Sequence, residues 1–175
     1  MIDLPAKFYR RSAVEVAPDL LGRYLVCQGP DGKLCQARIT EVEAYEGPDD
    51  KASHASRGPT PRNQVMFGPG GVWYIYLVYG MHNMLNIVTG SEGWPAAVLI
   101  RSVAGIEGPG RLTKAWGIDR SFNGQKAVKE RGLYVSGVPV DLKRSIRTAP
   151  RVGINYAPAV WRDKPYRFFL ENLLN

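Results

Sequence analysis

The sequence contains few of the residues that bind metals or form disulfides. It has two cysteines and two histidines among 175 residues. Cys27 and Cys35 do not form a CxxC pair, and both lie in apolar or alternating segments, which indicates buried free thiols in a reducing compartment. His54 and His82 are 28 residues apart, a separation that is not typical of zinc ligands. The sequence therefore predicts neither a metal site nor a cofactor.

Long apolar segments are also missing. Residues 1–11 contain no apolar stretch of the kind found in secretion signals. No run approaches the ~20 apolar residues that a membrane-spanning helix needs. Internal repeats and low-complexity stretches are not visible either. We therefore expect a cytoplasmic protein that does not enter a membrane.

Basic residues outnumber acidic ones. The chain has 23 Lys plus Arg against 16 Asp plus Glu, which gives a formal net charge of +7. This excess suits a polyanionic partner, although a soluble basic protein with no nucleic-acid role has the same composition. Hydrophobic residues make up 45% of the chain, enough to fill a core and to argue against disorder. At this length we expect a single domain over residues 1–175.

The charges are unevenly distributed along the chain. Almost a third of the carboxylates lie within ten residues, at Glu41, Glu43, Glu46, Asp49 and Asp50. The second half carries most of the basic residues, including Lys143, Arg144, Arg147, Arg151, Arg162, Lys164 and Arg167. This distribution predicts an acidic site in the first half, framed by a phosphate-contacting surface built largely from the second half.

Apolar patterns predict both helices and strands. Helices are predicted at residues 12–21 and 110–116. Strands are predicted at residues 23–28, 34–45, 72–79, 83–88 and 95–103. Residues 47–62 form a loop that is too long for a simple connection, and such loops are usually functional or disordered. Helices and strands are interspersed irregularly, without a regular βαβ order. We therefore predict an α+β domain around a mostly antiparallel sheet.

One predicted strand carries a carboxylate near its end. If the strand is regular, Cys35, Ala37 and Ile39 share a face with Glu41 and Glu43. A carboxylate on an apolar face costs free energy unless it is paired or solvated. It can be a strand-end carboxylate paired with a basic neighbour, or it can be a positioned general base.

Tyrosines form a second signal. Tyr45, Tyr74 and Tyr76 lie in predicted strands, where tyrosine is an ordinary sheet residue. Tyr79 differs because it precedes a predicted turn at residues 80–82, and an exposed aromatic at a hairpin tip can insert between base pairs. His54 can be structural or catalytic, and Arg101, which ends the apolar run AAVLIR, can be an edge charge or an anion clamp.

These segments resemble a known family of enzymes. EAYEGPDDKASH, TPRN, MFGPGG, YIYLVYGMHNMLNIV and VLIRS, in this order and spacing, are similar to the alkyladenine DNA glycosylases, also called 3-methyladenine DNA glycosylases. The similarity continues through EGPGRLTKAWGI to RVGI and WRDKPYRF, and so covers nearly the whole chain. It implies a curved antiparallel sheet with flanking helices and a protruding, DNA-inserting β-hairpin.

The resemblance implies a catalytic pair and a base pocket. Glu43 matches the general base that activates the water attacking the deoxyribose C1′ carbon. Arg101 matches the residue that helps to hold that water. Tyr45, His54 and Tyr76 match the walls that stack the flipped base.

The resemblance also implies roles in discrimination and in DNA insertion. Asn86 matches the pocket residue that opposes the 2-amino group of normal guanine. Tyr79 matches the wedge that fills the space left in the duplex, and Met66 matches a second residue near the flipped-out nucleotide, which we assign with Tyr79 to DNA intercalation.

The resemblance therefore predicts a monofunctional repair glycosylase of bacterial type. We expect it to act as a monomer at the nucleoid on double-stranded DNA with damaged purines: 3-methyladenine, 7-methylguanine, hypoxanthine or ethenoadenine. No lysine falls at the matched catalytic positions, which argues for simple hydrolysis without strand cleavage. Two alternatives remain, a non-catalytic nucleic-acid-binding module with an aromatic stacking platform and a hydrolase of free nucleosides.

Overall fold

A curved, mostly antiparallel sheet organises the protein. The computed structural model describes residues 2–29, 32–137 and 145–171. The strands are β1 (Tyr24–Gln28), β2 (Leu34–Glu46), β3 (Trp73–Val78), β4 (His82–Val88), β5 (Ala96–Val103), β6 (Leu133–Ser136), β7 (Ile146–Ala149) and β8 (Arg167–Leu170). They are ordered β3-β4-β5-β2-β1-β6, and β8 joins β2 to β7. The predicted α+β fold with a curved antiparallel sheet is confirmed.

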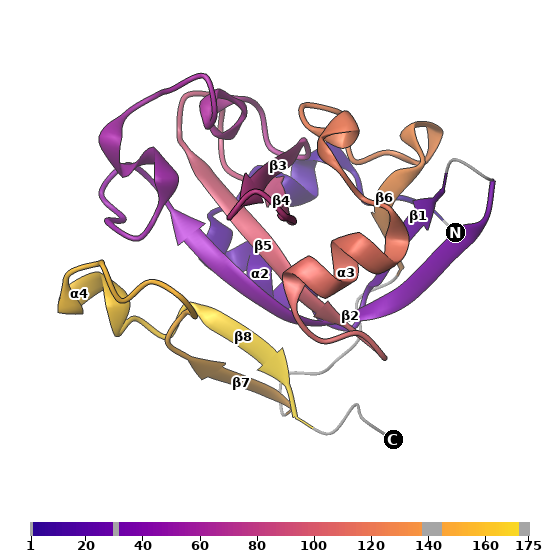
Figure 1. Ribbon diagram of the computed structural model, residues 1–175. Helices are drawn as coiled ribbons and strands as arrows, with labels where there is room; N and C mark the ends of the chain where they lie inside the picture. Colours follow the sequence, from indigo (N-terminus) through magenta and orange to yellow (C-terminus); the bar gives the residue numbers. More distant parts are fainter. Residues whose placement is uncertain (1, 30–31, 138–144, 172–175) are drawn as a thin grey trace.

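The long strand β2 connects the parts of this sheet. Its first half pairs with β1, and its second half pairs with β5 on one side and β8 on the other. Strand β8, in yellow, therefore runs alongside β2 although more than a hundred residues separate the two in sequence, and β7 pairs with β8 (Figure 1). This pairing brings the C-terminal part of the chain next to the acidic segment.

Helices cover the sheet on two sides. The α-helices are α1 (Ala6–Tyr9), α2 (Ala13–Leu20), α3 (Pro109–Trp116) and α4 (Ala159–Arg162). Ser12 and Glu15 form a capping box that starts α2, and Val16 and Leu20 are fully buried against the sheet. In Figure 1, α2 lies behind the strands and α3 in front of them. Both predicted helices are confirmed. Within the described residues, no helix is long and apolar enough to cross a membrane.

The prediction that Glu43 shares the apolar face of its strand is wrong. Thr40 has no partner in the β2–β5 register, because Ile39 pairs with Val103 and Glu41 with Ser102. This extra residue is a β-bulge, and it reverses the alternation of side chains. As a result Cys35, Ala37 and Ile39 pack in the main core together with Val42 and Ala44. Glu43 and Tyr45 point instead to the other side of the sheet, where a pocket lies.

A matching irregularity occurs in β5. Arg101 is skipped in the same register, since Val42 pairs with Ile100 immediately after Glu41 pairs with Ser102. Ile100 and Val103 both pack in the main core, whereas Arg101 lines the same pocket as Glu43. The two bulges therefore aim an acidic and a basic side chain at one place.

The predicted hairpin forms from β3 and β4, but its turn begins earlier than residues 80–82. Val78 pairs with His82, and the Met81 N–H donates to the Val78 carbonyl at 3.1 Å. Tyr79 and Gly80 have φ angles of 52° and 72°, the positive values that the two central residues of a type I′ turn require. His82 consequently belongs to the return strand. A bulky residue in this left-handed region carries a conformational cost of about 1–2 kcal/mol.

Candidate active site

All eight predicted site residues line one pocket. This pocket has a volume of about 470 Å³ and lies between the second half of β2, the β3–β4 hairpin, β5 and the segment 152–156. The predicted residues in its lining are Glu43, Tyr45, His54, Met66, Tyr76, Tyr79, Asn86 and Arg101. Residues from both halves of the chain therefore meet in one cavity.

Glu43 is buried in the pocket wall and is held by three groups. Its side chain is 0% exposed. Oε1 accepts a hydrogen bond from the Val152 N–H at 2.7 Å and lies 3.2 Å from the Arg101 guanidinium. Oε2 accepts from the Tyr45 hydroxyl at 2.9 Å. The carboxylate is therefore fixed in orientation.

The pKa values of two neighbouring carboxyl groups, Glu43 and Glu41, are shifted in opposite directions by their surroundings. Burial raises the pKa of Glu43, although the charge of Arg101 and the Val152 and Tyr45 donors oppose this. Burial also acts on Glu41, but hydrogen bonds and charges from Arg167 and Arg101 outweigh it and lower the pKa of Glu41. Separated pKa values of this kind are typical of sites where one carboxyl exchanges a proton and the other stays ionised.

Arg101 is held between these carboxylates. Its Nε donates to Glu41 Oε1 at 3.1 Å, while its terminal nitrogen faces Glu43. Glu41 is anchored in turn by Arg167 at 3.0 Å and by the Ser102 hydroxyl at 2.9 Å. The arginine is therefore oriented by a network that extends from β2 to β8. Within the described residues, no group of three His, Cys, Asp or Glu side chains could hold a metal ion.

Aromatic rings form the opposite side of the pocket. The His54 and Tyr76 rings lie 4.5 Å apart between centroids, and Tyr74 lies 5.2 Å from Tyr76. The Tyr74 hydroxyl is 3.2 Å from His54 Nδ1. Partial burial and the charge of Arg62 lower the pKa of His54, while burial raises the pKa of Tyr74 to about 12 and also raises that of Tyr76. These rings are therefore neutral at neutral pH and suited to stacking.

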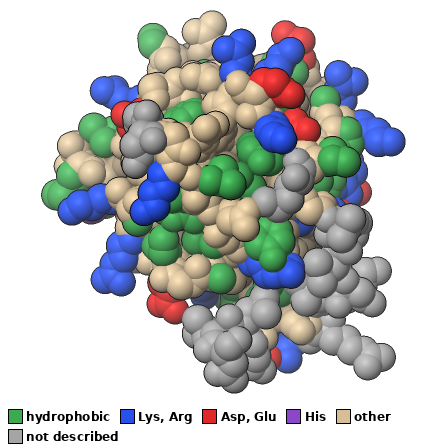
Figure 2. All heavy atoms as spheres, turned by 90° about the vertical axis from the view of Figure 1, so that its right-hand side faces the viewer, with side chains coloured by type: hydrophobic (Ala, Val, Ile, Leu, Met, Phe, Trp, Pro, Cys, Tyr) green, Lys and Arg blue, Asp and Glu red, His purple; other side chains and the backbone are tan. Residues whose placement is uncertain are grey.

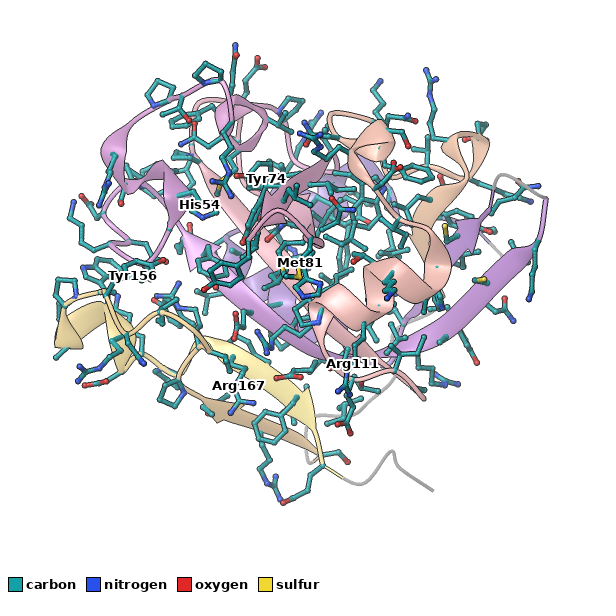
Figure 3. All side chains as sticks on the ribbon, in the orientation of Figure 1. His54, Tyr74, Met81, Arg111, Tyr156 and Arg167 are labelled. Carbon is teal, nitrogen blue, oxygen red and sulfur yellow. The ribbon has the colours of Figure 1, made fainter. Side chains whose placement is uncertain are left out.

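An asparagine side chain closes the loop that carries His54, which connects β2 to β3. This loop contains two short 3-10 helices, His54–Arg57 and Gln64–Phe67. The Asn63 amide donates to the carbonyls of His54 and Gly58, each at 3.0 Å. Asn63 is the last residue of the TPRN motif, so its position in the motif is explained by loop closure. In Figure 3, His54 from this loop lies above Tyr156 from the C-terminal segment, and both line the pocket.

Asn86 is buried and fixed to the backbone. It is 3% exposed, and its amide nitrogen donates to the Tyr74 and Met84 carbonyls at 3.1 Å and 3.0 Å. Both amide hydrogens are committed in this way, so the side chain cannot turn without losing two hydrogen bonds. Asn86 therefore forms a rigid part of the pocket wall.

The two residues assigned to DNA intercalation occupy different positions. Tyr79 is 88% exposed at the hairpin tip and at the pocket rim, next to the exposed Met81. Met66 is 2% exposed and packs with Ala55 and Tyr74. The burial of Met66 fits a residue of the pocket wall and does not fit one that enters a duplex.

Several residues of the site are absent from the sequence prediction. Val152 and Tyr156 line the pocket, and behind its wall Asp50 forms an ion pair with Arg151. The RVGI motif contains Arg151 and Val152 and marks this segment, but its contact with β2 arises only from the sheet topology. Nothing in the local sequence predicts a pair separated by 101 residues.

Cations from the first half of the chain also lie beside the pocket, and the phosphate-contacting surface expected from the second half stays a prediction. A groove that adjoins the pocket is lined by Lys51, Arg57 and Arg62 and, among the described residues, by no carboxylate. In the second half, Arg151 is buried and Arg167 binds Glu41, while Lys143 and Arg144 lie outside the described residues. On the face at the right of Figure 1, Lys and Arg side chains are scattered among apolar and neutral groups (Figure 2).

The chain is similar to known proteins over nearly its whole length. Residues 7–107 and 104–173 match the sequence profile of the methylpurine-DNA glycosylase (MPG) family. The chain is 45% identical to a protein of Anaeromyxobacter sp. strain Fw109-5, an alignment that covers 96% of this chain and 89% of the relative. It is 44% identical to a protein of Methanocella arvoryzae (97% and 92% covered) and 42% identical to one of Legionella pneumophila strain Lens (98% and 96% covered). All three are provisionally named 3-methyladenine DNA glycosylases. The chain therefore belongs to the methylpurine-DNA glycosylase family and is a DNA repair glycosylase, a hydrolase of N-glycosyl bonds.

Proposed function

We propose that the protein flips alkylated or deaminated purines out of duplex DNA and hydrolyses their glycosidic bond with a water activated by Glu43. The observation that supports this most strongly is the fixed, buried carboxylate of Glu43 in a pocket with neutral aromatic walls. The names of the relatives support 3-methyladenine as one substrate. The proposed further substrates of the same class are 7-methylguanine, hypoxanthine and ethenoadenine.

The pocket offers what a flipped damaged base needs. A base inside a duplex cannot reach an enzyme group, so it must leave the stack at a cost of a few kcal/mol. Damaged bases are often poorly paired, which lowers that cost. A cationic alkylated base also stacks favourably on the electron-rich faces of Tyr45 and Tyr76.

The reaction then requires one carboxylate. Glu43 accepts a proton from the water as the water oxygen bonds to C1′, and the C1′–N bond breaks with its electron pair on the base. A cationic base leaves as a neutral molecule, so little acid catalysis is needed. The Glu43 carboxylate also stabilises the positive charge that develops on the sugar. Arg101, fixed by Glu41, helps to hold the water.

The first test is an excision assay on defined duplexes. We expect the protein to release hypoxanthine or ethenoadenine and to leave an abasic site that breaks in hot alkali. A non-catalytic binding module would bind the duplex without alkali-sensitive breaks. A nucleoside hydrolase would cleave free inosine faster than the duplex, and either result would contradict the proposal.

Tyr79→Ala should weaken capture of the flipped nucleotide without changing the salt dependence of binding. The substitution removes the exposed ring at the hairpin tip but no charge. The slope of log affinity against log salt should remain that of the parent, about −0.9 for each phosphate contacted. Excision from a stable duplex should slow, and a Tyr79→Ala protein that excises normally would refute the wedge role.

Arg57→Gln is the matched comparison for Tyr79→Ala, because it removes a charge and leaves the exposed ring in place. Arg57 lines the cationic groove beside the pocket and carries no predicted catalytic role. We expect this variant to lower the salt slope by about 1 while the excision rate at saturating enzyme is retained. An unchanged slope would show that the groove does not contact phosphate.

Asn86→Ser should increase the release of normal guanine relative to hypoxanthine. The two bases differ by the 2-amino group, and a rigid wall can reject an added group by crowding. A smaller residue opens space, and each ~1.4 kcal/mol of penalty removed changes the ratio about tenfold. The measurement is the ratio of the two excision rates at one duplex position.

Asn83→Ser is the control for this ratio. Asn83 lies on the same strand but does not line the pocket. Its substitution should leave the guanine to hypoxanthine ratio unchanged. If Asn86→Ser lowers both rates equally, the role of Asn86 is to satisfy the Tyr74 and Met84 carbonyls and the discrimination hypothesis is wrong.

A further inference from the structure

Asp50 and Arg151 form a fully buried ion pair behind the pocket wall. Both side chains are 0% exposed. The guanidinium binds both carboxylate oxygens, with 2.9 Å between one terminal nitrogen and Asp50 Oδ1. The carboxylate also accepts the N–H groups of Glu46 and Ala52, each at 3.1 Å. Removal of two charges from water makes such pairs a weak source of stability.

The arginine ties together segments that are distant in sequence. Its terminal nitrogens also donate to the Ala44 carbonyl on β2 at 2.9 Å and to the Trp161 carbonyl on α4 at 3.1 Å. Its Nε is buried without a hydrogen-bond partner among the described residues. An unsatisfied buried donor is unfavourable, so the geometry is not the one that stability alone would favour.

Both neutral donors of Glu43 depend on this arginine. Val152, which donates to Oε1, is the residue directly after Arg151. Tyr45, which donates to Oε2, follows Ala44, and its ring lies 4.7 Å from the guanidinium carbon. A shift of the guanidinium would move the Val152 amide and the Tyr45 ring together.

We infer that the Asp50–Arg151 pair is a positioning device that holds the two neutral donors on Glu43 and so determines the pH range in which the enzyme acts. This inference rests on the proposed role of Glu43 as the base. Neither residue touches the base or the sugar in this role. They act through Val152 and Tyr45.

The direction of the effect follows from the groups that face Glu43. These are Arg101 on β5, Glu41 and Tyr45 on β2, Tyr76 on β3, and Tyr156 in the C-terminal segment. Burial raises the pKa values of the three tyrosines, so they are neutral donors at neutral pH. Hydrogen bonds to a carboxylate lower its pKa, and loss of the Val152 and Tyr45 donors must therefore raise the pKa of Glu43 further. The ionised, active fraction then falls at a given pH.

The test is the pH profile of single-turnover hypoxanthine excision for two variants. Arg151→Lys keeps the charge but cannot make the forked contacts to Asp50, Ala44 and Trp161. The double variant Asp50→Asn/Arg151→Met removes both charges. We expect the acid limb of each profile to move to higher pH by about one unit, a tenfold loss of rate on that limb, with most of the rate regained at alkaline pH.

Arg11→Lys is the matched control, because Arg11 also pairs with an aspartate but does not line the pocket. The acid limb of the pH profile of this variant should not move. A rate that falls equally at every pH, or failure of both Asp50–Arg151 variants to fold, would show that the pair is only structural and overturn the inference. Failure of the proposed function is a separate result, seen as a parent profile whose acid limb persists in Glu43→Gln.

Discussion

Glu43→Gln is expected to abolish most excision activity while DNA binding is retained. The amide keeps the shape of the side chain and can still accept from Val152 and Arg101, but it cannot take a proton from water. Loss of a general base typically costs ~10²-fold or more in rate. Single-turnover excision of hypoxanthine measures the chemical step, and the affinity for uncleaved duplex is measured in parallel. A rate within a few-fold of the parent would refute the assignment of Glu43.

Protein stability provides an independent control for the same variant. Since the folded protein raises the pKa of Glu43, it binds more protons than the unfolded chain in the window above the ordinary pKa of 4.5. The contribution of Glu43 to stability is therefore largest at low pH and is lost as the pH rises through the raised value. At neutral pH the buried charge is unfavourable, so we expect the melting temperature of Glu43→Gln to equal or exceed that of the parent. A large decrease would mean that the activity loss reports misfolding.

Asp50→Asn is expected to cause the largest loss of stability. The substitution leaves the Arg151 cation buried without its counter-charge. Removal of one partner of a buried pair typically costs about 3–5 kcal/mol, whereas replacement of both partners is often nearly neutral. Chemical denaturation should therefore show a much lower free energy of unfolding for Asp50→Asn than for Asp50→Asn/Arg151→Met.

Asp19→Asn serves as the control for this comparison. Asp19 pairs with Arg11 at 2.8 Å, but the two side chains are 51% and 37% exposed. Exposed pairs contribute about 0–1 kcal/mol, so this variant should unfold close to the parent. If Asp50→Asn is equally mild, the buried pair does not carry the coupling that its geometry indicates.

Local sequence patterns predicted much of the fold, because local chemistry determines those elements. Apolar patterns predicted a helix at residues 12–21, where α2 lies, and also predicted the strands that follow it. The prediction failed where one residue alters the pairing. Thr40 interrupts the alternation of β2 with no Gly or Pro to mark it, since a bulge depends on the facing strand as much as on its own sequence.

The site residues divide in the same way, into those that the sequence predicted and those that only the tertiary structure brings in. The resemblance to glycosylases predicted which residues touch a base or water, and the structure brings those residues to one pocket. Their roles remain predictions. The Val152 amide and the Asp50–Arg151 pair were not predicted, because a backbone donor has no side-chain signature and the two ion-pair partners meet only through the packing of the C-terminal segment beside β2.

The bulge at Thr40 makes the backbone pairing of β2 a determinant of function. If Thr40 paired regularly with β5, the alternation after Ile39 would reverse without a change in any side chain of the pocket, so that the Glu43 carboxylate would face the core and Val42 and Ala44 would face the substrate. For this strand, the pairing of the backbone between Ile39 and Glu43 matters as much to catalysis as the identity of its residues.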